Sequence, residues 1–169
     1  MDIEFSPRDR TLYAKLYASF SDVALARRCA EHIKAKGWYR RPWSRGTIYF
    51  QQSAFVTSLV VSYSRPFSPG RGGLAFPKRL IPYNPNQWAL HDQLIGQRNE
   101  VYAHSDLERW TVRPWRSADF ETTIVGQPIL VLEPPQIEAF LEMTEPLMNA
   151  IRSRMDEIHG SHRNEGGPE

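Results

Sequence analysis

Apolar side chains recur at three- and four-residue steps in two long segments, one near each end of the chain. In residues 10–36 this stripe consists of Leu12, Leu16, Phe20, Val23, Ala26, Ala30 and Ile33. In residues 135–159 it consists of Ile137, Phe140, Leu141, Met148, Ile151, Met155 and Ile158. Because this spacing follows one face of an α-helix, both segments are predicted to be long helices that bury one side. Gly37 is a good helix stop, whereas Ser21 and Asp22 could cap a new start, so the first segment is one helix or two with a corner.

Two further helices are predicted between these segments. Residues 47–63 show both a helical face and a strand-like alternation of Val56, Ser58, Val60 and Ser62. Their length favours a helix, because strands typically have about 5–6 residues. Asn84 followed by Pro85 is a clean helix start, a cap and then proline at the first helical position. The helix that begins there is predicted to span residues 86–104.

The segments between the helices are of two kinds. Residues 64–85 are rich in glycine and proline and are long for a connection, which indicates that they are functional or mobile. Residues 110–115 and 122–132 are rich in Trp, Thr, Val and Ile, which favours a small hairpin. The predicted fold is therefore mainly α, a four-helix-type bundle with a small β-hairpin-like insertion before the last helix. Residues 1–160 are predicted to form a single helical domain, and residues 161–169 a disordered polar tail.

The composition agrees with an ordinary globular domain. The chain has 169 residues, of which 41% are hydrophobic and 24% charged. No apolar run approaches the ~20 residues of a membrane span, and the N-terminus lacks a signal-peptide pattern. Its one cysteine, Cys29, has no partner for an internal disulfide and is predicted to be a small core residue. We therefore expect a cytoplasmic protein without membrane contact.

Charge is spread unevenly although the net charge is only +2. No Asp or Glu occurs between His32 and His91, where nine lysines and arginines lie, and the acidic residues gather after Val131. Such asymmetry is typical of a surface for phosphates or nucleic acid. The alternative is a solvated loop face, docked on an acidic partner or on a second copy of the chain.

The segment of the third predicted helix with the most unusual polar residues is Arg98-Asn99-Glu100-Val101-Tyr102-Ala103-His104. It resembles the motif of the HEPN superfamily, an arginine and a histidine separated by four to six residues, with a polar residue directly after the arginine. It is similar in particular to HEPN proteins of the abortive-infection and toxin-like type. The close resemblance covers about 25 residues, and the rest of the chain matches only as a helical pattern.

The resemblance implies a four-helix bundle that forms a homodimer, with two Arg–His pairs in one cleft, and metal-independent cleavage of RNA in active members. In that chemistry the ribose 2′-hydroxyl is the nucleophile, and a group that titrates near neutrality must remove its proton. His104 would take that role, Arg98 would stabilise the charge on the phosphate, and Asn99 would position the phosphate or the histidine. An antitoxin or another partner protein is a further expected partner.

Two features modify this interpretation. Some toxin-type members have a tyrosine two residues after the histidine, where a partner enzyme modifies them, whereas this chain has Asp106. The purely structural alternative is that Arg98 pairs with Asp92, Glu100 or Asp106, and that His104 is a helix-terminal histidine favoured by the helix dipole.

Other residues are candidates for contact with a substrate. On a regular helix His91, Arg98 and Tyr102 fall on one face, so His91 and Tyr102 are predicted to line the same surface. Arg40, Arg41 and Arg45 interleave with Trp38, Tyr39 and Trp43, which either stack on unpaired bases or anchor the loop.

A third hypothesis is a metal-dependent hydrolase built on His91-Asp92, with His32 as the one upstream ligand candidate. No zinc motif and no glycine-rich phosphate loop occurs in the sequence, so no metal and no cofactor is predicted. A non-catalytic helical module that binds a partner protein or nucleic acid remains the main alternative to a nuclease.

Overall fold

A computed structural model describes residues 5–68, 74–102, 111–126 and 128–163 of the chain. Its four helices are α1 (Pro7–Lys36), α2 (Ile48–Ser64), α3 (Pro85–Gln97) and α4 (Pro134–Arg163). A two-stranded antiparallel hairpin, β1 (Thr111–Arg116) and β2 (Glu121–Gly126), lies between α3 and α4 in the chain. The prediction of a mainly α fold with four helices and a hairpin before the last helix is confirmed.

Helix α1 is continuous from Pro7 to Lys36, so of the two alternatives the single helix is correct, and no corner occurs at Ser21 and Asp22. It begins three residues earlier than expected because the hydroxyl of Ser6 accepts a hydrogen bond from the N–H of Asp9 at 3.1 Å. It ends as expected at Gly37, whose positive φ of 60° lets the chain leave the helix.

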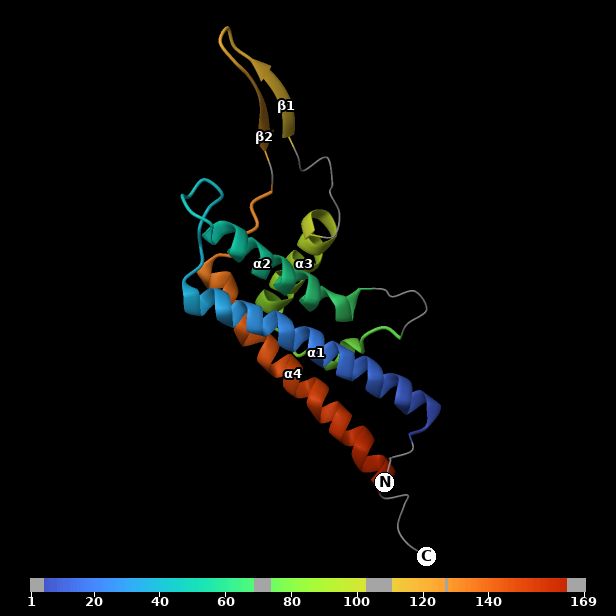
Figure 1. The fold of residues 1–169 in the computed structure, drawn as a ribbon. Helices are drawn as coiled ribbons and strands as arrows, with labels where there is room; N and C mark the ends of the chain where they lie inside the picture. Colours follow the sequence, from blue (N-terminus) through green and yellow to red (C-terminus); the bar gives the residue numbers. More distant parts are fainter. Residues whose placement is uncertain (1–4, 69–73, 103–110, 127, 164–169) are drawn as a thin grey trace, which may run out of the picture.

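The two long helices run antiparallel, side by side, and α2 and α3 pack over their upper half (Figure 1). Where the start of α1 meets the end of α4, the ring of Tyr13 stacks on His159 at 4.9 Å. Helix α4 continues past Gly160 to Arg163, three residues beyond the predicted domain end. Residues 164–169 of the predicted tail lie outside the described residues.

The core lies between all four helices and is almost wholly apolar. Its largest fully buried side chains include Leu16 and Ile33 of α1, Leu59 and Tyr63 of α2, and Phe140 of α4. Cys29 is also buried in α1, as predicted for a small core residue. Burial raises the pKa of its thiol, which keeps the sulfur in its unreactive protonated form.

The hairpin stands clear of the bundle at the end where α3 finishes (Figure 1). The chain that returns from it to α4 is attached to α2, because the N–H of Leu130 donates to the Tyr49 hydroxyl at 3.1 Å. Leu132, two residues on, is buried in the core. The segment that follows the hairpin is therefore anchored to the bundle at Leu130 and Leu132.

Candidate functional site

Arg98 and Asn99 lie directly after the last α-helical turn of α3. The helix begins with a reciprocal capping box in which Asn84 and Gln87 each bond the other's backbone N–H, as the Asn84–Pro85 pair predicts. Its α-helical part ends at Gln97, and residues Arg98–Tyr102 continue as a π-helix. The predicted helix over residues 86–104 is thus helical as far as Tyr102, with a π-helical last part, and residues 103 and 104 lie outside the described residues. Single π-helical turns occur frequently at functional sites.

The side chains of Arg98 and Asn99 contact each other. The Nη1 of Arg98 donates to the Oδ1 of Asn99 at 2.9 Å, and both side chains reach solvent. Among the described residues no carboxylate forms an ion pair with Arg98, and the predicted alternative pair with Asp92 does not form. The guanidinium is thus oriented by a neutral amide and still has donors for an anion.

His104 and Asp106 lie outside the described residues, and so does the side chain of Tyr102. The pairing of Arg98 with His104, and the place of Tyr102 beside them, stay predictions.

His91, two turns before Arg98, is buried among aromatic rings. Its Nδ1 is 2.7 Å from the Tyr63 hydroxyl, which in turn is 3.1 Å from the Tyr83 hydroxyl. Four rings surround the imidazole, those of Phe67, Trp88, Tyr63 and Tyr83, with centroids 4.7–5.9 Å away. Burial lowers the pKa of His91, and the nearby charge of Asp92 opposes that shift only in part. The imidazole is therefore neutral at pH 7.

Burial also keeps the two phenols protonated. It raises the pKa of both Tyr63 and Tyr83. Two neutral hydroxyls and a neutral imidazole thus form a short hydrogen-bonded chain in which no group has a net charge. The helical spacing predicted that His91 and Arg98 line one surface. In the structure His91 is instead buried among the aromatic rings.

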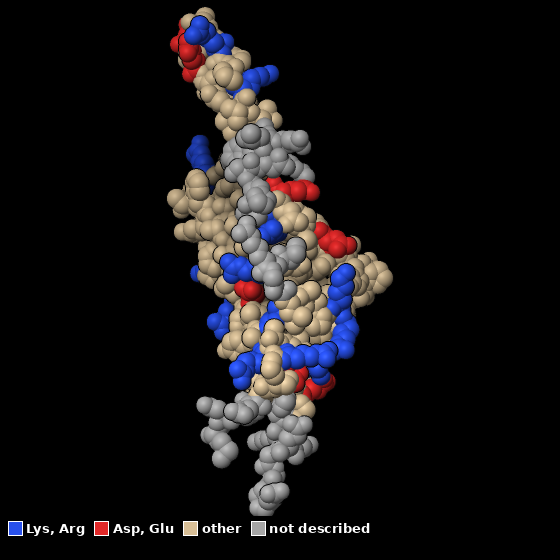
Figure 2. All heavy atoms as spheres, turned by 90° about the vertical axis from the view of Figure 1, so that its right-hand side faces the viewer, with Lys and Arg blue, Asp and Glu red and all other residues tan. Residues whose placement is uncertain are grey.

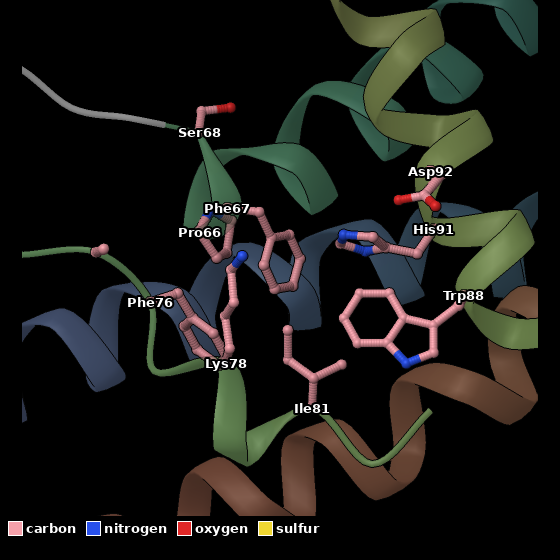
Figure 3. Close-up of a pocket in the computed structure, with 10 residues that line it drawn as sticks. Pro66, Phe67, Ser68, Phe76, Lys78, Ile81, Trp88, His91 and Asp92 are labelled. Atoms are coloured by element: carbon pink, nitrogen blue, oxygen red, sulfur yellow. The ribbon is translucent and has the colours of Figure 1, made fainter. Parts of the chain in front are cut away.

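One side of His91 opens into a pocket of about 390 Å³ between α3 and the segment after α2 (Figure 3). Its walls are mostly apolar, and Lys78 and Asp92 are its charged groups. The ten lining residues are Pro66, Phe67, Ser68, Ala75, Phe76, Lys78, Ile81, Trp88, His91 and Asp92. An apolar pocket with a few polar groups is the usual form of a small-ligand site.

The pocket depends on residues that the sequence did not single out. Tyr63 ends α2, and Tyr83 and Phe76 belong to the Gly/Pro-rich connection, yet all three are buried. Within the described part of that connection, the chain forms two short 3₁₀ turns, Arg65–Phe67 and Lys78–Leu80. Residues 69–73 lie outside the description. Seven of the ten residues that line the pocket therefore belong to this connection.

The described residues do not support the metal-site hypothesis for His91-Asp92. No group of three or more His, Cys, Asp or Glu side chains that could hold a metal ion occurs among them. His32 is packed elsewhere, with its ring stacked on Phe55 at 4.5 Å and against Trp38 at 5.1 Å. Those contacts also identify Trp38 as a loop anchor and not as a free stacking platform.

The three arginines predicted to bind substrate lie between α1 and α2. Arg41 forms an ion pair with Glu133 at 2.5 Å, whereas Arg40 and Arg45 have exposed side chains. The backbone of Arg40 is fixed by the buried Gln52, whose amide bonds both its N–H and its C=O. The loop lies at the same end of the bundle as the hairpin (Figure 1), so only two of the three arginines are free to add positive charge there.

Other basic residues of the acid-free stretch also have partners in the fold. Lys34 pairs with Glu138 at 3.1 Å, and Arg65 pairs with Asp22 at 3.2 Å. On the face shown in Figure 2, lysines and arginines are spread over the bundle with acidic side chains between them. The sequence asymmetry is thus partly cancelled in space, which weakens the argument from charge for nucleic acid.

Within the part of the chain that the structure describes, no helix combines the length and the apolar character needed to cross a bilayer. Comparison with protein-family models, with curated proteins and with solved structures finds no match to this chain.

Proposed function

We propose that this protein is a metal-independent endoribonuclease of the HEPN toxin or defence type, acting through Arg98, Asn99 and His104. The observation that supports it most directly is the half-buried Arg98 side chain, whose guanidinium Asn99 orients and no described carboxylate neutralises. A purely structural arginine would be expected to have an acidic partner, as Arg41 and Arg65 have. The four-helix architecture is the second support.

The reaction needs no co-reactant besides RNA. His104 removes the proton of a ribose 2′-hydroxyl, and the 2′-oxygen attacks the adjacent phosphorus. The bond from phosphorus to the 5′-oxygen breaks, and that oxygen leaves with a proton, so the products are a 2′,3′-cyclic phosphate and a 5′-hydroxyl. Arg98 stabilises the charge on the phosphate oxygens through parallel hydrogen bonds. In the proposed homodimer two such pairs share one cleft, and Arg40 and Arg45 contact the RNA strand.

The test is cleavage of a mixed RNA pool in the presence of EDTA. The wild-type protein should cut it, and Arg98→Ala and His104→Ala should each lower the rate at least a hundredfold. Arg10→Ala is the control, because it removes one positive charge from the exposed surface of the first turns of α1. Circular dichroism and thermal unfolding establish that each variant is folded. Cleavage that persists in both site variants, or that EDTA abolishes, would exclude the proposal.

A second function is favoured by the His91 pocket, namely a non-catalytic module that binds single-stranded nucleic acid. The aromatic walls formed by Phe67 and Trp88 could stack on an unpaired base, and Lys78 lies where it could meet a phosphate. Binding of short single-stranded RNA should then fall about tenfold or more in Trp88→Ala. Tyr17→Ala is the control, because Tyr17 is an aromatic residue of α1 that is 60% exposed and lies outside the candidate contact surfaces. Equal losses in both variants would exclude the pocket as the binding site.

A further inference from the structure

The hairpin formed by β1 and β2 exposes unusually many apolar side chains. All twelve of its strand residues are exposed, with Val112 at 61% and Val125 at 52%. The other large exposed apolar residues of the hairpin are Trp115, Phe120 and Ile124. A two-stranded hairpin that packs on nothing is at best marginally stable in water. This hairpin therefore has the properties of an element that is completed by a partner.

The hydrogen-bond pattern of the hairpin can be worked out from its turn. The N–H of Ser117 donates to the carbonyl of Phe120 at 2.8 Å, so these two opposite residues form a hydrogen-bonded pair. In an antiparallel ladder hydrogen-bonded and non-hydrogen-bonded pairs alternate. The observed register matches Pro114 with Thr123, three pairs from the turn, and this pair is therefore non-hydrogen-bonded.

This alternation of hydrogen-bonded and non-hydrogen-bonded pairs makes the two edges of the hairpin different. The backbone nitrogen of Pro114 points away from β2 and has no hydrogen to donate, which blocks further pairing along β1. On β2 the outward residues are Glu121, Thr123 and Val125, and each has a free backbone N–H and C=O pointing outward. The hairpin thus has one closed edge and one open edge.

We propose that the open edge of β2 pairs antiparallel with β2 of a second copy of this chain, forming a four-stranded sheet in the order β1-β2-β2-β1. A twofold axis through Thr123 would place Thr123 opposite its own copy and Glu121 opposite Val125 of the second copy. The three outward residues of each chain then form about six backbone hydrogen bonds. Because Pro114 closes both outer edges, the sheet itself ends at four strands.

Charge favours a second copy as the occupant. The hairpin has two basic and two acidic residues, namely Arg113, Arg116, Asp119 and Glu121, and both signs lie at its tip (Figure 2). Glu121 forms an ion pair with Arg116 of its own hairpin. In the twofold arrangement each Glu121 faces a valine, and no two like charges are directly opposite, which would destabilise the pairing.

The shape of the molecule allows this pairing. The hairpin projects beyond the bundle (Figure 1), and antiparallel pairing places the two bundles at opposite ends of the shared sheet. A six-residue strand spans about 20 Å, so the bundles would not overlap. This contact is a different surface from the cleft of the proposed nuclease dimer and does not depend on that proposal.

The first test compares Thr123→Pro with Thr123→Val by light scattering over a concentration series. Thr123→Pro removes an outward N–H and leaves the hydrogen bonds inside the hairpin, whereas Thr123→Val keeps the N–H and a β-branched side chain. We expect the mass of the wild type to be at least twice the 19.6 kDa of one chain. Thr123→Pro should halve that mass, and Thr123→Val should leave it unchanged. A wild type that stays monomeric, or a folded Thr123→Pro of unchanged mass, would overturn the proposal.

A second pair of variants tests the register without touching the backbone. Val125→Glu places a second carboxylate opposite Glu121 of the other copy, and Val125→Lys places a cation there. The dissociation constant should be about tenfold higher for Val125→Glu than for Val125→Lys. Amide hydrogen exchange gives an independent measurement, because the outward amides of Thr123 and Val125 are protected only when the edge is paired. Equal dissociation constants, or rapid exchange of those amides in the wild type, would contradict the pairing.

Discussion

Removal of one hydroxyl group, by Tyr63→Phe, should destabilise the fold far more than its size suggests. Tyr63 has no exposed surface, and its hydroxyl is 2.7 Å from the Nδ1 of His91 and 3.1 Å from the hydroxyl of Tyr83. Phenylalanine fills nearly the same volume, so packing is preserved and only the hydrogen bonds are lost. Two buried polar atoms then lose their common partner.

The magnitude follows from those two contacts. A net hydrogen bond stabilises by about 1 kcal/mol, and a buried polar atom left without a partner costs about 1–3 kcal/mol. His91 and Tyr83 retain 7% and 9% of their surface, so water can reach them in part. We therefore expect a loss of roughly 2–3 kcal/mol in the free energy of unfolding. For a chain of this length the melting temperature should fall by roughly 5–10 °C.

Urea unfolding followed by circular dichroism measures this loss. Tyr83→Phe should cost only about 1 kcal/mol, because Tyr63 keeps its bond to His91. Tyr17→Phe is the matched control, since Tyr17 is 60% exposed on α1 and should change the stability by less than about 0.5 kcal/mol. If Tyr63→Phe stayed within that same range, or if Tyr83→Phe cost more than Tyr63→Phe, the hydrogen-bonded chain would not be a stabilising element.

Three further predictions concern single groups. Burial lowers the pKa of His91 in the folded protein. Between that lowered pKa and about pH 6.5, the unfolded chain therefore binds more protons than the folded protein. The free energy of unfolding should consequently fall as the pH drops below about 6.5. His91→Asn should reduce that slope in unfolding experiments at several pH values, and a slope equal to that of the wild type would contradict the prediction. Asn84→Ala removes the capping box of α3 and should cost about 1 kcal/mol, measured by urea unfolding; no change would mean that the cap is dispensable. Asn99→Ala should lower the rate of RNA cleavage with little effect on stability, because it frees the Arg98 guanidinium. Asn99→Gln, which keeps a neutral amide oxygen, should recover part of the rate, whereas Asn99→Asp should not, because its carboxylate would neutralise the guanidinium. A rate equal to the wild type in Asn99→Ala would exclude the positioning role.

Helical periodicity, segment length and a helix cap predicted the four helices, and β-favouring residues predicted the hairpin, but the course of the first helix stayed open between one helix and two. Ser21 and Asp22 are cap-forming residues, and local sequence allowed a new start there. In the fold Asp22 forms an ion pair with Arg65, 43 residues away, and remains inside a continuous helix. The competing interaction is tertiary, so no local pattern could have revealed it.

The pocket was beyond prediction for the same reason. His91 was a candidate because of its position on a helical face, yet its hydrogen-bond partner ends α2 and the next phenol lies in the Gly/Pro-rich connection. These partners are 28 and 20 residues apart along the chain. Only the placement of α2 against α3 brings them together, and spacing along the sequence contains no signal of it.

His91 and Arg98, which were predicted to line one surface, belong to two places with different chemistry. His91 lines the pocket, and Arg98 contacts Asn99. Seven residues of helix span about 10 Å, which places the buried imidazole and the exposed guanidinium too far apart to hold one small molecule between them. The imidazole is neutral and hydrogen-bonded to the phenol of Tyr63, so it is suited to recognising an uncharged group in the pocket. The guanidinium is charged, oriented by an amide and open to solvent, so it is suited to an anion. A polynucleotide is the one ligand class considered for this protein that could offer a base to the first and a phosphate to the second. Binding of a base in the pocket is expected of both the nuclease and the binding module. The two functions are therefore distinguished by whether RNA is cleaved and whether that cleavage depends on Arg98.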